Sequence, residues 1–214
     1  QTLRSNTTGE GNTASGSGAL FYNTTGFANT ATGTYSLNNN SIGNNNTAIG
    51  YRALESSTTG NFNTASGSNA LSYNTTGLWN TGIGSNALYF NIEGNANVAV
   101  GNAALLSNAT GSSNTANGTD ALFWNISGSS NTAIGHRTLF TNTTGVNNTA
   151  VGKEALLTIL TGSNNTAIGY KADVAEDAIV NATAIGSTAY AGASNSVVIG
   201  SVNGVNGATA SANV

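Results

Sequence analysis

The sequence has no cysteine, proline or methionine, and only 6% of its 214 residues are charged. Without cysteine, disulfide bonds and thiolate chemistry are excluded, and the redox compartment is left undetermined. The five Lys and Arg residues, in a chain of net charge −3, do not cluster along the sequence, so we expect no nucleic-acid binding. No apolar run is long enough to span a membrane.

Large apolar side chains are also scarce, because Asn, Thr, Gly, Ala and Ser dominate the composition. Such a composition provides little material for a conventional globular core. It can indicate disorder, but here the apolar residues recur in strict order, which favours a folded repeat protein. The chain begins with Gln1 instead of Met, so we expect a removed secretion signal and an extracellular or cell-surface location.

One phrase recurs every 17 residues, as "NTAIGYRALESSTTGNF" (46–62) and "NTASGSNALSYNTTGLW" (63–79) illustrate. Two glycine columns, which include Gly16 and Gly26, and a leucine column from Leu3 keep the same step. The asparagine that opens the phrase stands at Asn12, Asn29, Asn46, Asn63, Asn80, Asn97, Asn114, Asn131, Asn148 and Asn165. The period is too short for helix pairs, so it predicts an all-β fold, a parallel β-solenoid with one repeat per coil.

Each slot of the phrase has a physical role in such a coil. Strand alternation places Ala and Gly on one face and Thr and the variable residue on the other, and the small face is expected to be crowded. The leucine fills the core, and the asparagines are expected to form a hydrogen-bonded structural ladder. We expect positive φ in both the Gly16 and the Gly26 columns. The lack of proline fits, since each coil needs its backbone N–H groups.

The outward strand face combines threonine with a variable slot that is often Ile or Val, as at Ile49, Ile83 and Ile134. A mostly apolar stripe along a thin rod is not expected to face water. We therefore expect the same stripe on sister chains to cover it.

The step changes to 14 residues between Gly186 and Gly200, in "TAIGSTAYAGASNSVVIG". This phrase resembles the head repeat of YadA-like trimeric autotransporter adhesins, and the 17-residue form is similar to related bacterial surface fibres and phage-tail-fibre-like proteins. The resemblance implies a trimer of left-handed parallel β-rolls. It also implies three regions: regular coils over 1–170, a register change and a 14-residue coil over 171–200, and a Gly/Asn/Ala/Ser-rich linker or inter-subunit contact over 201–214.

The slots that vary from coil to coil hold most charged and aromatic residues, so we expect them to form the outer surface. The aromatic side chains there are candidates for sugar stacking or for lateral contacts between chains. The residues singled out are Tyr51, Trp79, Trp124 and Tyr170. His136, the only histidine, is interpreted as a surface residue because no second ligand stands near it.

Catalysis finds no support, because the carboxylates are scattered singly along the repeat. The nearest group is Asp173, Glu176 and Asp177, where the second glycine column fails. Three oxygen-bearing side chains are a weak candidate for a cation site, and a solvated loop is the alternative. We predict no enzyme activity and no cofactor.

These observations favour a structural or adhesive surface fibre, a homotrimeric rod that attaches to glycans or to host or abiotic surfaces. The first nine residues lack the strand half of their coil, so we also expect a neighbouring subunit to stack end to end and form a filament. Two alternatives stay open. The threonine column suits an ice-binding solenoid, and the outward aromatics suit a carbohydrate-binding module.

Overall fold

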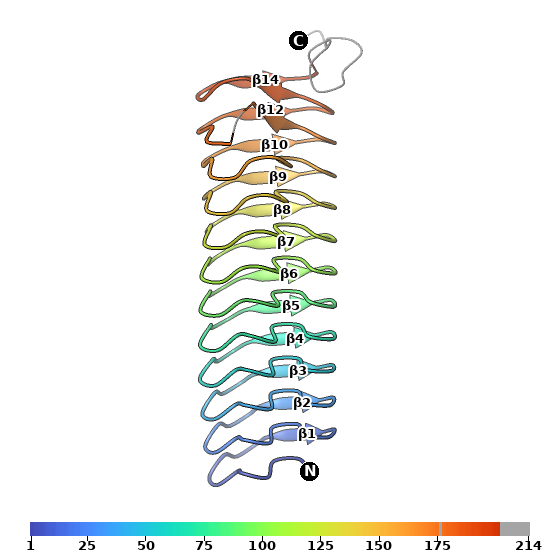
Figure 1. Cartoon of the computed structure of the whole chain (residues 1–214), viewed down its shortest axis with the longest axis vertical. Coiled ribbons are helices and arrows are strands. Elements are labelled where there is room, and N and C mark those ends of the chain that lie inside the picture. The colour runs from blue at the N-terminus through green and yellow to red at the C-terminus, as the bar shows by residue number, and fades with distance from the viewer. Residues whose placement is uncertain (176, 202–214) are drawn as a thin grey trace.

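A computed structural model describes residues 1–175 and 177–201 of the chain. The described part contains strands and turns but no helix, and its coils stack into one straight rod (Figure 1). One sheet of 12 parallel strands runs along the whole rod. The predicted all-β solenoid is therefore confirmed. Glu176 lies outside the described residues, as do residues 202–214 of the predicted linker or inter-subunit contact over 201–214.

The long sheet takes one short strand from each coil. Its strand order is β1-β2-β3-β4-β5-β6-β7-β8-β9-β10-β12-β14, and β11 pairs with β13 in a second, two-stranded sheet. The bounds are β1 Thr13–Ser15, β2 Thr30–Thr32, β3 Thr47–Ile49, β4 Thr64–Ser66, β5 Thr81–Ile83, β6 Val98–Val100, β7 Thr115–Asn117, β8 Thr132–Ile134, β9 Thr149–Val151, β10 Thr166–Ile168, β11 Asp173–Val174, β12 Thr183–Ile185, β13 Tyr190–Ala191 and β14 Val197–Ile199.

The strand register follows the repeat. Thr47 pairs with Thr64, so identical slots stack on one another. This step continues to Thr183, which pairs with Thr166, and then shortens, because Thr183 pairs with Val197 in β14. The change from 17 to 14 residues therefore occurs between β12 and β14.

A narrow core lies behind the sheet. The middle residue of most strands is a buried alanine, and each regular coil adds one fully buried leucine, such as Leu88. Burying a leucine contributes about 1.5–3 kcal/mol, so this column is the main apolar contribution of each coil. The leucines adopt positive φ, 53° at Leu88, a conformation that the sequence did not lead us to expect because bulky residues rarely adopt it.

The two glycine columns serve different purposes. Gly50 and its equivalents after each strand have positive φ, 133° at Gly50, as predicted. The prediction of positive φ in the second column is wrong, because Gly43 and its equivalents are not in that region. There a Cβ would overlap the Oδ1 of Asn40 and the carbonyl oxygen of Gly60 in the next coil. Close approach of successive coils, and not turn conformation, excludes a side chain.

Candidate functional site

The outer face of the long sheet carries two ranks of side chains. The first residue of each strand forms a threonine rank, which Val98 and Val197 interrupt. The third residue forms a mixed rank of Ile, Val, Ser, Thr and Asn. In this rank Ile49, Ile83 and Ile134 are between 41% and 47% exposed. The face is therefore a partly apolar surface that no other part of residues 1–175 and 177–201 covers.

The asparagines that open the phrase form a continuous ladder beside the strands. The Oδ1 of Asn97 accepts hydrogen bonds from the backbone N–H and the Nδ2 of Asn114, at 3.0 and 3.2 Å. The Nδ2 of Asn97 donates to the Oδ1 of Asn80 at 3.1 Å and to the carbonyl of Gly111 at 2.8 Å. Asn97 is fully buried. These side chains are saturated by the fold and are not available to a ligand.

Sequence reasoning missed a second asparagine ladder. The Nδ2 of Asn108 donates to the Oδ1 of Asn91 at 2.6 Å, and the Nδ2 of Asn125 donates to the Oδ1 of Asn108 at 2.7 Å. The signal was present in the sequence as a second asparagine column on the same step. Its members are Asn6, Asn23, Asn40, Asn74, Asn91, Asn108, Asn125 and Asn142, with Ser57 in one coil.

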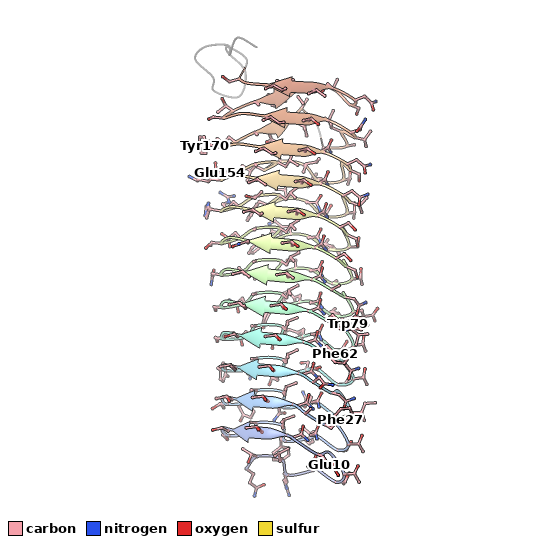
Figure 2. All side chains as sticks on the ribbon, turned by 180° about the vertical axis from the view of Figure 1, so that it is seen from behind. Glu10, Phe27, Phe62, Trp79, Glu154 and Tyr170 are labelled. Carbon is pink, nitrogen blue, oxygen red and sulfur yellow. The ribbon has the colours of Figure 1, made fainter. Side chains whose placement is uncertain are left out.

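The rod has two long edges beside the sheet. We call the turns that follow the strands the trailing edge; they hold Tyr51 and Tyr170. The residues just before the strands form the leading edge, which holds Phe62 and Trp79. Figure 2 places Phe62 and Trp79 on one side of the rod and Tyr170 on the other. The four predicted aromatic residues, Trp124 included, are between 45% and 58% exposed, but they do not form one site.

Cations cover rings on the trailing edge. The Nζ atoms of Lys153 and Lys171 lie 5.8 and 5.5 Å from the ring centroid of Tyr170, and they lie 3.4 and 3.6 Å from the carboxylate of Glu154. Desolvation acts to raise the pKa of Glu154, but the two lysines outweigh it and lower this pKa. The two lysines are far apart in the sequence, but the stacking of coils brings them to the same ring and carboxylate. Their charge is partly neutralised by Glu154.

Tyr51 and Trp124 have other surroundings. The Arg52 guanidinium lies 5.3 Å from the ring centroid of Tyr51. Trp124 lies on the segment that returns behind the sheet, where its ring centroid is 4.8 Å from that of Phe123. The exposed His136 is placed on the trailing edge as a surface residue.

Phe62 and Trp79 form a pair of rings on the leading edge. Their ring centroids are 6.2 Å apart and their planes differ by only 12°. Both residues have left-handed backbones, with φ of 58° and 56°. This conformation costs a residue with a side chain about 1–2 kcal/mol. In the other coils the slot holds small or polar residues in the same conformation: Gly11, Ala28, Asn45, Ala96, Ser113, Ser130, Asn147, Asn164 and Asn181.

Of the acidic group near the C-terminal end, the structure describes Asp173 and Asp177. Asp173 is buried in β11, whereas Asp177 is exposed on a turn, so the solvated-loop interpretation is wrong for Asp173. Burial raises the pKa of Asp173 to about 6, although hydrogen bonds from the Val174 N–H and the Thr158 hydroxyl oppose the shift. Within the described ranges, no group of three His, Cys, Asp or Glu side chains gathers in a way that could hold a metal ion.

Within the described part of the chain, no helix is long and apolar enough to cross a membrane. No protein-family model, curated protein or solved structure matches the chain. The resemblance to YadA-like heads accordingly stays a prediction from the repeated phrase, and function has to be argued from the surfaces.

Proposed function

We propose that the chain is a non-enzymatic structural fibre or adhesin of the extracellular surface, built as a rigid homotrimeric rod that can stack end to end. The observation that carries the proposal is the uncovered apolar part of the mixed rank. Ile49, Ile83 and Ile134 recur on one straight face, where water contact is unfavourable at each exposed side chain. The same face of sister chains has a matching period and would cover it.

The shape of the rod supports a spacer role. Each coil contacts its neighbours through backbone bonds such as Thr81 N–H to the Asn97 carbonyl at 2.8 Å, and this bond recurs from coil to coil. Stability in such solenoids is built up locally along the axis, so length can increase without a larger core. The exposed edges then remain free to contact a surface.

Light scattering tests the assembly directly. We expect a solution mass three times the 21.2 kDa of one chain. The double variant Ile49→Lys/Ile134→Lys places two charges on the outer sheet face and should reduce the mass to that of one chain. As a matched control, Ile42→Lys/Ile126→Lys changes two equally exposed isoleucines away from this face and should leave the trimer intact. A native mass of one chain would refute the assembly.

Ice binding is a second candidate, because the structure presents threonines in register on one parallel sheet. Thr30 pairs with Thr47, and Thr47 with Thr64. The mixed rank argues against it, since isoleucine, serine and asparagine alternate where a second regular rank is wanted. Both candidates use the same face, so they exclude each other. A thermal hysteresis measurement with no effect at millimolar protein removes ice binding.

A further inference from the structure

We propose that Phe62 and Trp79 form a binding site for neutral carbohydrate, in which sugar rings stack on the aromatic pair. The proposal names a ligand class for the adhesive part of the proposed function and rests on that function. It does not depend on the trimer, because both rings belong to one chain. Of the four aromatic residues singled out from the sequence, it selects Trp79.

The fold itself does not require rings in this slot. Other coils fill it with Gly, Ala, Ser or Asn at the same backbone conformation, as at Asn45 and Ala96 on either side of the pair. Asparagine tolerates left-handed φ far better than phenylalanine or tryptophan. Two bulky aromatic residues in adjacent coils therefore add backbone strain that asparagine or glycine in the same slot would avoid. Such strain persists mainly where a site has a use for it.

The two rings also contribute little to the buried core. Phe62 is 52% exposed and Trp79 is 58% exposed. The planes of the two rings are nearly parallel, but their contact leaves most of the ring surface open to solvent. The neighbouring slot-mates Asn45 and Ala96 add no ring to the row, so the aromatic surface covers only two coils. A stable protein interface needs about 800 Å² on each partner, far more than two side chains supply. One or two sugar rings match the extent of the pair.

Polar groups beside the pair suit a neutral sugar. Asn61 precedes Phe62 and Asn95 precedes Ala96, and both amides are partly exposed. The Oδ1 atoms accept backbone N–H groups, from Asn44 to Asn61 at 2.7 Å and from Leu78 to Asn95 at 2.8 Å, which fixes the amide positions. No charged residue occurs from 56 to 92. Apolar ring faces flanked by oriented amides, without charge, favour hydroxyl-rich neutral ligands over acidic ones.

Rings also stack on the return segment, where the Tyr73 and Phe90 centroids are 5.4 Å apart with planes 26° apart, but Trp124 is not part of such a pair. Trp124 packs edge-on against Phe123, with an interplanar angle of 73°, in a cluster that also contains Phe140 and Arg137. Phe27 shares the leading edge in Figure 2, but no ring stacks on it. Trp124→Phe and Phe27→Asn are consequently matched controls, since Phe90 and Asn44 occupy the same slots in other coils.

Tryptophan fluorescence tests the proposal in the full chain. In Trp124→Phe, Trp79 is the sole tryptophan, and we titrate this variant with cellohexaose, chitohexaose and mannohexaose. A saturable change in Trp79 emission with at least one of these hexaoses is expected. Adding Phe62→Asn should weaken binding at least tenfold, whereas adding Phe27→Asn should leave it unchanged. Absence of binding to all three hexaoses, or equal affinity after Phe62→Asn, would overturn the proposal.

Thermal melting separates binding from structure. Phe62→Asn and Trp79→Asn introduce the residue that this slot holds in four other coils, so Tm should stay constant or rise. A marked fall in Tm would assign the rings to stability and contradict the binding role. A change in solution mass on Trp79→Asn, without sugar binding, would instead assign the pair to a contact between chains. Failure of the trimer test above leaves the titration result unaffected, so the two proposals fail independently.

Discussion

The regular coils and the last coils stack on one another in the same way but use different residues in their cores. Through residue 156 a leucine fills the core slot, but one step later the buried Asp173 occupies it. In the same region Ile159 replaces the second-ladder asparagine, and Ile179 takes the slot of the second glycine column. The buried strand alanine and the glycine after the strand persist at Ala184 and Gly186. The strand alanine and its following glycine thus persist through β12, while the return half uses different residues.

The comparison indicates where substitution should be costly. In the regular coils the return half holds the buried leucine and the second asparagine ladder, packed closely against the next coil. In the last coils this half is packed less closely at Gly192, where an added Cβ would meet no atom within 4 Å. The same type of substitution should therefore reduce the stability of the regular coils strongly and that of the last coils only slightly.

Glycine-to-alanine substitution should show the largest difference. Gly43→Ala forces a methyl group against the Oδ1 of Asn40, whose Nδ2 is bonded to Asn23, and against the Gly60 carbonyl of the next coil, so we expect a loss of more than about 3 kcal/mol. Gly192→Ala should change stability by less than about 0.5 kcal/mol. Denaturant unfolding of the two variants measures the contrast, and equal losses would mean that the coils are not close-packed at the second glycine column.

Removing one rung of the first asparagine ladder should have the next largest effect. Asn97→Ala leaves the buried Asn114 N–H without its acceptor and removes one of the two amide donors to the Gly111 carbonyl, which costs about 2–5 kcal/mol in total. Ser194→Ala removes the exposed bond from the Val180 N–H in the last coils and should cost less than about 1 kcal/mol. Hydrogen exchange should accordingly accelerate around Asn97 but scarcely around Val180. Uniform exchange in both variants would contradict a local ladder.

Asp173 should give a smaller, pH-dependent effect of opposite sign. Its folded pKa, about 6, lies above its ordinary value of 3.8, so the folded chain binds the proton more tightly than the unfolded chain. Stability from this group is fully present below about pH 4 and is lost as the pH rises to about 6. Asp173→Asn should therefore stabilise the last coils at pH 7 by roughly 2–3 kcal/mol and leave them nearly unchanged at pH 4. Melting curves that shift equally at both pH values would show that Asp173 is not held in a desolvated site.

Much of this architecture is readable from the sequence, because every slot recurs on a fixed step. The core leucines, the first ladder and the outward position of Trp79 follow from counting residues. The same count places Asp173 in the leucine column and Phe62 one coil from Trp79, so both positions could have been predicted from the repeat. It also separates Trp79 from Trp124, which lie in different slots.

Other features depend on three-dimensional packing. The left-handed φ of Leu88 and the overlap that excludes a side chain at Gly43 result from how closely successive coils approach. No residue preference signals a leucine in that conformation. The near-parallel arrangement of the Phe62 and Trp79 rings likewise arises from side-chain orientation, which spacing alone does not determine.

Cysteine cross-linking tests the central claim, that the outer sheet face is buried between copies of the chain. The sequence has no cysteine, so single substitutions give an unambiguous signal. Ile134→Cys lies on the exposed mixed rank and should form disulfide-linked dimers under mild oxidation, whereas Tyr51→Cys on the trailing edge should not. Cross-linking that is absent at residue 134, or no faster there than at residue 51, would contradict the assembly of the rod through this face.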